Sequence, residues 1–254
     1  MKQDDFGDRM KDYEKVFTST KIDPSQYMCV RIDGKGFSKF TKGFVKPFDD
    51  RITNAMISTT KALVKETHAS VGYTQSDEIT LIYPPTEGER MFGGKVAKIN
   101  SVFASIATAH FNHHIRAHVD KFAYFDCRVW SVPDAVEASN VLLWRVQDAR
   151  KNSISSLMRW TCGHKRMANL SGLQMIDVMQ VEKNVDWHDL PNIWKYGTYV
   201  KPTTYETYMT DEEMQDIPEG KKPIGVPVKR TKIESVDIGY FGDLDLEKRM
   251  NFIK

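Results

Sequence analysis

The sequence predicts an α+β fold in which helices cover one face of a mainly antiparallel sheet. Short apolar, β-branched runs bounded by turn residues predict strands. Longer segments with apolar residues at every third or fourth position predict amphipathic helices. After an N-terminal helix, the predicted order is β-α-β and then α-β-α, which is typical of a sandwich of sheet and helices.

The helices are predicted from their apolar periodicity and from their start signals. Asp49 and Asp50 precede the second helix, and acidic side chains at a helix start interact favourably with the helix dipole. In the third helix Val96, Ile99 and Phe103 share one face. Helices are expected at residues 4–17, 51–67, 94–118, 135–160 and 174–181.

The strand regions are predicted from runs rich in β-branched and aromatic residues. The first is followed by a glycine-bearing turn, residues 33–38, whose amides could approach a phosphate. The second strand region ends at Pro84-Pro85. In the third, apolar and polar residues alternate and several are aromatic. Strand regions are expected at residues 27–32, 73–83 and 121–132.

Composition excludes several classes of protein. With 254 residues, 41% of them hydrophobic, the chain can bury a sizeable core and does not resemble a disordered protein. The net charge of +2 indicates no polyanionic partner, so a nucleic-acid surface would be a local patch. Three widely spaced cysteines fit a reducing cytosol. No signal peptide or membrane-spanning run is evident, so we expect a soluble, cytoplasmic protein without membrane contact.

Two short carboxylate motifs are the most informative features of the sequence. Asp33 stands at the end of an apolar, β-branched run, and Asp77 stands at the start of another. If the two strands are neighbours, these carboxylates face each other across the sheet beside Gly34. Such a pair on rigid strands would hold two hard divalent cations, which is an arrangement used to move phosphoryl groups. We therefore expect a protein that handles nucleotides.

These aspartates could also have a purely structural role. An aspartate at a strand edge is more often a turn former or a helix cap than a metal ligand. Metal binding is favoured here because Gly34 offers an unhindered carbonyl and Ser76 a hydroxyl. Glu78 points to the opposite face of its strand from Asp77, so its role stays open.

Basic residues offer possible sites for phosphates. Lys95 and Lys98 lie one turn apart near the start of a predicted helix, where a triphosphate would fit. A further basic set surrounds Gln147-Asp148, although a charge run is usually a solvated face. The histidines at 110, 114 and 118 have zinc-like spacing, but a solvated helix face is the favoured interpretation. No P-loop or dinucleotide-binding glycine motif is present.

These motifs resemble the tRNA(His) guanylyltransferase family, and more closely its guanylyltransferase-like branch of 3′→5′ polymerases. The likeness covers about residues 4–200 and is specific in its first half. The motifs that carry it are Arg31-Ile32-Asp33-Gly34-Lys35-Gly36-Phe37-Ser38-Lys39-Phe40-Thr41, Gln75-Ser76-Asp77-Glu78 and Trp144-Arg145-Val146-Gln147-Asp148-Ala149.

The resemblance implies a palm-like (ferredoxin-like) antiparallel sheet covered by helices, as in polymerase and nucleotide cyclase catalytic cores. It implies one catalytic domain over residues 1–254, with a core at about 4–165 and a C-terminal extension at about 166–254. The implied enzyme is an RNA nucleotidyltransferase that adds nucleotides to the 5′ end of tRNA or tRNA-like RNA. GTP and ATP would be the substrates, and two Mg²⁺ ions would be the cofactor. The protein would form a homo-oligomer, which by analogy is a tetramer.

The resemblance also implies roles for individual residues. Asp33, Asp77 and Lys46 would be catalytic, and Asp33, the carbonyl of Gly34 and Asp77 would hold the metal. The nucleotide would be bound by Asp33, Gly34, Lys35, Gly36, Phe37, Ser38, Ser76, Asp77, Lys95 and Lys98. RNA contacts would come from Arg145, Arg150, Lys151 and Asn152.

The sequence departs from the family pattern at several places, including the lack of the family's Lys-Asn pair within residues 173–181. Eukaryotic members carry a His-Ile-Asn-Asn-Leu-Tyr-Asn motif where this chain has residues 150–156, and only Asn152 is kept. This favours the broader, template-dependent branch over dedicated tRNA(His) recognition. A family histidine is replaced by Ser38, which favours addition to a triphosphorylated 5′ end.

Two rival functions stay open at this point. A nucleotide cyclase of the same fold would also use two carboxylates and Mg²⁺, but it would need no RNA. A non-catalytic RNA-binding protein of the same fold is the second rival. Asp33 and Asp77 argue against it, because a binder gains nothing from uncompensated acids that face phosphates.

Overall fold

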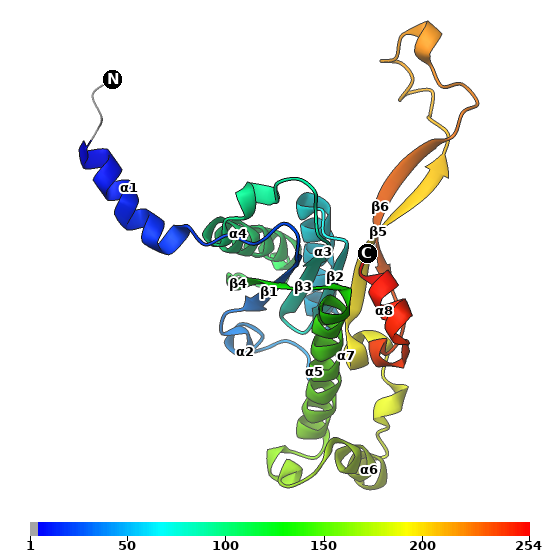
Figure 1. The fold of residues 1–254 in the computed structure, drawn as a ribbon. Coiled ribbons are helices and arrows are strands. Elements are labelled where there is room, and N and C mark those ends of the chain that lie inside the picture. The colour runs from blue at the N-terminus through cyan, green and yellow to red at the C-terminus, as the bar shows by residue number, and fades with distance from the viewer. Residues whose placement is uncertain (1–4) are drawn as a thin grey trace.

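The computed structural model describes residues 5–254 and contains a six-stranded antiparallel sheet, with the strand order β4-β1-β3-β2-β5-β6 (Figure 1). Every neighbouring pair of strands is antiparallel, so the predicted α+β class with an antiparallel sheet is confirmed. The strands are β1 (Tyr27–Gly34), β2 (Val71–Gln75), β3 (Glu78–Tyr83), β4 (Phe125–Val132), β5 (Thr198–Thr207) and β6 (Val228–Val236).

The predicted helices are present, and the ends that can be compared differ from the predictions by at most three residues. The predicted start at residue 4 lies outside the described residues. The α-helices are α1 (Asp5–Thr18), α2 (Phe37–Phe40), α3 (Asp50–Thr67), α4 (Val96–Ile115), α5 (Ala135–Thr161), α6 (Gly172–Lys183), α7 (Asn192–Tyr196) and α8 (Leu246–Phe252). Short 3-10 helices are η1 (Met91–Gly94), η2 (His164–Met167), η3 (Trp187–Asp189), η4 (Glu219–Lys221) and η5 (Phe241–Asp243). No helix in residues 5–254 combines the length and the hydrophobicity that a bilayer crossing requires.

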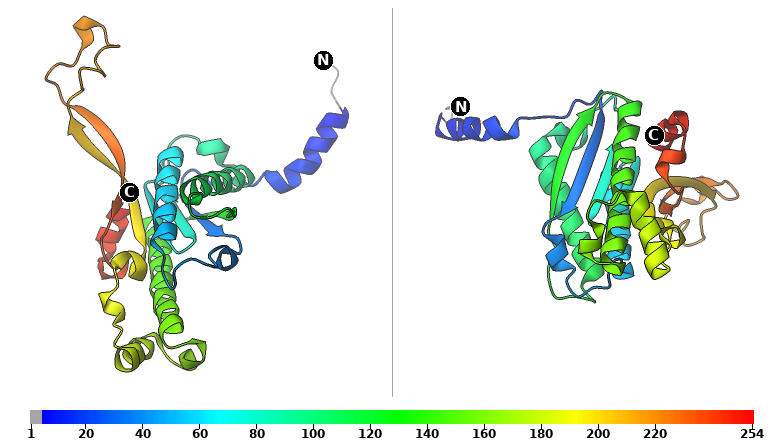
Figure 2. Two further views of the ribbon diagram at one scale, coloured as in Figure 1. Left: turned by 180° about the vertical axis from the view of Figure 1, so that it is seen from behind. Right: turned by 90° about the horizontal axis from the view of Figure 1, so that it is seen from below.

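Helices cover both faces of the sheet, so the prediction that they cover one face is wrong. α3 and α4 pack on one face, and α5 packs on the other (Figures 1 and 2). Alternate residues of β1 serve the two cores, since Val30 belongs to the α3–α4 side and Cys29 to the α5 side. Every residue of β3 is buried, so both faces of this strand are covered.

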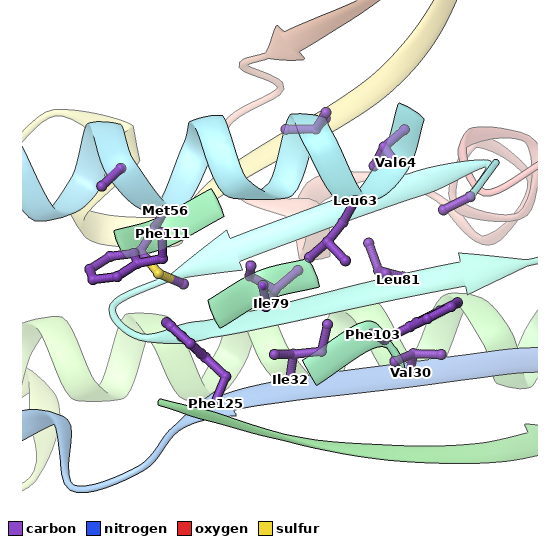
Figure 3. Packing of buried hydrophobic residues seen from close by; sticks show 14 of the residues in the cluster. Val30, Ile32, Met56, Leu63, Val64, Ile79, Leu81, Phe103, Phe111 and Phe125 are labelled. Atoms are coloured by element: carbon purple, nitrogen blue, oxygen red, sulfur yellow. The ribbon is translucent and has the colours of Figure 1, made fainter. Parts of the chain in front are cut away.

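The larger core lies between the sheet and the α3–α4 pair. Figure 3 shows Ile32, Ile79, Met56 and Phe111 gathered there, and each is at most 1% exposed. Burial of each such side chain contributes about 1.5–3 kcal/mol. Ile32 and Ile79 directly precede and follow the residues of the candidate site, so this core fixes the strand ends that carry it.

The second predicted strand region is two strands instead of one. β2 and β3 pair through the turn Ser76-Asp77, with Gln75 opposite Glu78. Ser76 has a φ of 51°, which allows the chain to reverse within two residues. Asp77 therefore lies in a hairpin turn and not in a strand.

The C-terminal part of the chain adds two strands that the sequence patterns did not predict. β5 pairs with β2, and β6 pairs with β5, so this part of the chain continues the central sheet. The β5–β6 hairpin projects from the body, and α1 projects from the opposite side (Figure 1). No residue of α1 is buried.

Candidate active site

The ends of two neighbouring strands bring Asp33 and Asp77 together. Asp33, near the end of β1, pairs with Glu78 at the start of β3. The carbonyl oxygen of Asp77 accepts a hydrogen bond of 3.1 Å from the amide of Gly34. The predicted proximity of the two aspartates is therefore confirmed.

The close approach of these two segments requires a glycine at position 34. A Cβ atom there would lie 3.0 Å from both Cβ and Oδ2 of Asp77, and 2.6 Å from Cδ2 of Phe37. Protein interiors are packed too densely to absorb such contacts without movement. The missing side chain of Gly34 is what allows the Asp77 carboxylate to lie against the end of β1.

The two carboxylates have no cationic partner in the part of the chain that the structure describes. Among the described residues, neither Asp33 nor Asp77 takes part in a salt bridge. Asp77 accepts a hydrogen bond of 3.1 Å from the hydroxyl of Ser76. Burial and, after it, the charge of Asp33 raise the pKa of Asp77. A divalent cation would relieve this repulsion, so the residues present fit Mg²⁺.

These carboxylates can supply only part of a metal's coordination shell. Residues 5–254 contain no group of three histidine, cysteine, aspartate or glutamate side chains arranged to hold a metal ion. Asp33, Asp77 and the carbonyl of Gly34 would leave several positions open. Mg²⁺ commonly fills such positions with water and with substrate phosphates.

Glu78 points to the α5 face of the sheet, where Arg145 binds it. Arg145 Nε donates to Glu78 Oε1 at 2.6 Å, and Nη2 donates to Oε2 at 2.7 Å. The same Nη2 donates to Asp148 Oδ2 at 2.9 Å. Burial alone would lower the pKa of Arg145, but the hydrogen bonds to Glu78 and the charge of Asp148 outweigh burial and raise it. α5 thereby fixes the start of β3 and the turn that carries Asp77.

The loop before α3 is organised by Asp49. Its carboxylate accepts hydrogen bonds from the amide of Val45 at 2.8 Å and from the amide of Arg51 at 2.9 Å. The guanidinium of Arg51 binds both carboxylate oxygens, which lowers the pKa of Asp49. Lys46 is exposed, and its Nζ donates to the Thr41 hydroxyl at 3.1 Å. An ammonium group has three donors, so Lys46 can still bind a ligand.

A pocket of about 860 Å³ opens beside the two aspartates. Its walls come from the loop at 41–49, the β2–β3 turn, α5 and α7. This volume is near the upper end of the range for small-molecule sites. The predicted site residues that line it are Asp33, Phe37, Ser38, Lys46, Ser76, Asp77, Arg145 and Asn152.

The turn after β1 contributes backbone groups to the candidate site more than side chains. Gly36 has a φ of 61° and stands at the start of the short helix α2. The ring of Phe37 is 5.5 Å from that of Phe111, edge to face, so this side chain belongs to the core. Lys35 is exposed, and its amide donates to the carbonyl of Tyr124 at 2.8 Å.

The structure does not bring Lys95 and Lys98 to this pocket. They lie at the start of α4, where the amide of Ile22 donates to the carbonyl of Gly94 at 2.9 Å. This end of α4 lies beyond the start of β1, whereas Asp33 is near the other end of that strand, roughly 20 Å away along β1. Within one copy of the chain, these lysines are far from the aspartates.

The predicted RNA contacts on α5 are only partly available to a ligand. Arg145 is buried and bound to Glu78 and Asp148, so its guanidinium is not free to contact RNA. This corrects the prediction for Arg145. Arg150 is partly buried, with its guanidinium 5.3 Å from the centre of a tryptophan ring. Lys151 and Asn152 are exposed.

Two features of the pocket were missed by the sequence analysis. One is the Glu78–Arg145 pair, whose members are 67 residues apart in the chain. The other is the stacked pair of Phe48 and Trp194, with ring centroids 5.1 Å apart and 12° between the ring planes. Neither pair has a local sequence signature.

Comparisons with known proteins agree with the geometry. The model of the tRNAHis guanylyltransferase family (Thg1) matches residues 7–133. A protein of Acanthamoeba polyphaga mimivirus is 33% identical over 229 residues, which are 79% of this chain and 78% of that protein. The tRNA(His) guanylyltransferase of Kluyveromyces lactis is 26% identical over 198 residues, 70% of this chain and 83% of that enzyme. A bacterial tRNA(His) guanylyltransferase-like protein, solved in complex with ATP, superposes with a TM-score of 0.81, 32% identity and 98% of each chain covered.

Proposed function

This chain belongs to the tRNAHis guanylyltransferase family and is a nucleotidyltransferase, and we propose that it adds nucleotides to the 5′ end of tRNA or tRNA-like RNA in the 3′→5′ direction. GTP and ATP are the proposed substrates, since similar bacterial proteins were solved in complex with each of them. The observation that carries the proposal is the Asp33–Asp77 pair, which has no cationic partner among the described residues and lines a pocket large enough for a nucleotide.

Mg²⁺ is the proposed cofactor, and Asp33, Asp77 and the carbonyl of Gly34 would hold it. A divalent cation at this place supplies positive charge that offsets the charge of phosphate oxygens during their transfer. The presence of two such ions follows from the family resemblance and stays a prediction.

The chain's own groups would position the phosphates. The amides of Gly36, Phe37 and Ser38 have no acceptor within residues 5–254, so they are free to donate to a phosphate. Lys46 would pair with the phosphate at the RNA 5′ end, because it lines the pocket and, within residues 5–254, its ammonium group donates only to a threonine hydroxyl. Positioning and charge neutralisation supply most of the catalysis in phosphoryl transfer.

In the proposed reaction, the 3′-hydroxyl oxygen of the added nucleotide forms a bond to the phosphorus at the RNA 5′ end. The hydroxyl proton is released to solvent, and the leaving group is pyrophosphate from a triphosphorylated end or AMP from an adenylylated end. The RNA therefore grows by one nucleotide at its 5′ end in each cycle.

A phosphate-binding role for Lys95 and Lys98 would require the pocket of a second copy of the chain, because they lie at the far end of α4. The predicted homo-oligomer is compatible with this arrangement. The oligomer, the cytoplasmic location and the single catalytic domain stay predictions, and light scattering on the purified protein tests the first of them.

The direct test supplies Mg²⁺, GTP labelled in its α-phosphate and a tRNA transcript that lacks its first nucleotide and carries a 5′ triphosphate. We expect labelled RNA with the new nucleotide at its 5′ end, as located by partial nuclease digestion. Growth at the 3′ end would contradict the proposal. Formation of a cyclic nucleotide from GTP without RNA would support the cyclase alternative instead.

A further inference from the structure

The pocket continues beyond the aspartates to an aromatic end. The rings of Phe48 and Trp194 stack there in parallel, with centroids 5.1 Å apart. Trp160, close to the end of α5, lines the same pocket and is 63% exposed. Most of its indole surface is therefore available to a ligand. α5 and α7, which carry the two tryptophans, lie side by side in Figures 1 and 2.

The α5 side of this region has small polar side chains and, at its outer end, an arginine. Asn152, Ser156 and Arg159 recur at helical spacing, so they share one face of α5, and all three line the pocket. The short serine side chain leaves room beside the aromatic rings. Arg159 is exposed and has no salt-bridge partner among the described residues.

The surroundings of the aromatic end are basic. Lys165 and Arg166 are exposed in η2, which follows the end of α5, and Arg166 is bound to Glu182. The aspartate end of the pocket is acidic by contrast. Exposed aromatic faces next to arginine and lysine side chains are the combination that binds single-stranded nucleic acid through base stacking and phosphate contacts.

We propose that this aromatic end, formed by Phe48, Trp160, Trp194 and Arg159, binds an unpaired nucleotide of the RNA substrate. Its base stacks on Trp160, and its phosphate is bound by Arg159. The added nucleotide occupies the Asp33 end of the same pocket. This assignment rests on the proposed function, because an enzyme that extends an RNA end must hold that end beside the incoming nucleotide.

The test compares Trp160→Ala and Trp160→Phe with the wild-type protein in two binding assays. One measures the Kd for the triphosphorylated, truncated tRNA transcript by filter binding, and the other measures the Kd for GTP by equilibrium dialysis. We expect Trp160→Ala to weaken RNA binding about tenfold and to leave GTP binding about unchanged. Trp160→Phe should restore most of the RNA affinity, because phenylalanine also offers a face for stacking.

Two further variants complete the design. Arg159→Gln should weaken RNA binding and reduce its dependence on salt, because one phosphate contact is lost. Phe122→Ala is the matched control, since Phe122 is an aromatic residue that is 71% exposed outside the pocket lining. It should leave both affinities unchanged.

Three outcomes would overturn the assignment. Unchanged RNA affinity in both Trp160→Ala and Arg159→Gln would exclude an RNA role for this region. An equal loss of GTP and RNA affinity would assign it to a nucleoside triphosphate. The same loss in Phe122→Ala would show a general effect of exposed aromatic residues. Failure of the proposed function can be told apart from failure of this assignment. If the proposed function were wrong, the wild-type protein would extend no RNA, even if the variants weakened RNA binding.

Discussion

Arg145 holds Glu78 through two hydrogen bonds of 2.6 and 2.7 Å, and this buried pair ties α5 to the hairpin that carries Asp77. Glu78 directly follows Asp77 and pairs with Asp33 across β1 and β3. The position of the candidate catalytic carboxylate is therefore set from both faces of the sheet. The α3–α4 core holds the strands, and α5 holds the turn.

Replacement of Arg145 by methionine leaves the Glu78 carboxylate buried without a partner. We expect the free energy of unfolding to fall by about 3–5 kcal/mol, the usual result of breaking a buried ion pair. Activity should fall as well, because the turn with Asp77 loses its support. RNA affinity of the folded variant should be unchanged, since Arg145 is buried. Urea unfolding and filter binding measure the two effects.

The matched control for Arg145→Met is Lys151→Met, at an exposed position of the same helix. A surface change of this kind should alter the free energy of unfolding by no more than about 0.5 kcal/mol. If Arg145→Met lowered RNA affinity and left stability intact, Arg145 would be an RNA contact after all.

Gly34→Ala should disturb the candidate site without unfolding the protein. The new methyl group would lie 3.0 Å from Oδ2 of Asp77, so the carboxylate must move. Displacement of a reacting group by about 1 Å can cost about 100-fold in rate, and we expect a loss of that size. Initial rates of nucleotide addition and circular dichroism measure activity and folding. Gly88→Ala, with nothing within 4 Å of its added Cβ, is the control. Full activity of Gly34→Ala would show that the close approach is not needed.

Asp49→Asn should destabilise the protein in a manner that depends on pH. Hydrogen bonding to Arg51 lowers the pKa of Asp49 below its ordinary value of 3.8. A carboxyl group with a lowered folded-state pKa stabilises the fold above its unfolded pKa, and this contribution is lost as the pH falls. We expect a loss of roughly 1–2 kcal/mol near neutral pH, because the charge-assisted hydrogen bonds to Arg51 are lost, whereas asparagine can still cap α3.

Chemical denaturation of wild type and Asp49→Asn at neutral pH and near pH 3 tests this prediction, since a carboxyl of ordinary pKa is mostly protonated at about that pH. The difference in unfolding free energy should shrink at the acidic pH, because Asp49 becomes protonated in the unfolded wild-type chain while Arg51 keeps it ionised in the folded state. A difference that stays constant would mean that the ion pair with Arg51 contributes nothing.

The predicted phosphate role of Lys98 leads to a mixing experiment. Lys98 is far from Asp77 in one copy of the chain, so in an oligomer Lys98 would serve the pocket of another copy. One intact pocket can then combine Asp77 from one subunit with Lys98 from the other. Lys98→Ala and Asp77→Asn should each be inactive, and a mixture of exchanged subunits should regain part of the activity. Asp33→Asn mixed with Asp77→Asn should regain none, because both changes damage the same pocket. Full activity of Lys98→Ala alone would remove this lysine from the mechanism.

The sequence predicted the parts of the site that lie within one segment. β1 is marked by its β-branched run, and Asp33 and Gly34 follow directly, so their place at a strand end could be predicted. The turn at Ser76 and Asp77 was missed because it contains no glycine or asparagine, the residues that usually mark a two-residue hairpin. Asp77 was nonetheless placed beside Asp33.

Contacts between distant segments could not be predicted from the sequence. Arg145 and Glu78 are 67 residues apart, and their pairing depends on α5 covering the second face of the sheet. β5 was not expected because it contains Pro202, and proline weakens a strand pattern. The edge position of the β5–β6 hairpin, with β5 joined to β2 through three residue pairs, is what accommodates this proline.

The central claim is that Asp33 and Asp77 together drive nucleotide addition at the RNA 5′ end. The most direct measurement is the rate of labelled GTP incorporation by wild type and Asp33→Asn at saturating RNA, Mg²⁺ and GTP, with RNA affinity measured in parallel. We predict a rate loss of about 100- to 1000-fold with unchanged RNA affinity, as expected when charge stabilisation of the transition state is removed. Asp33→Asn that extends the RNA at the wild-type rate would contradict the claim.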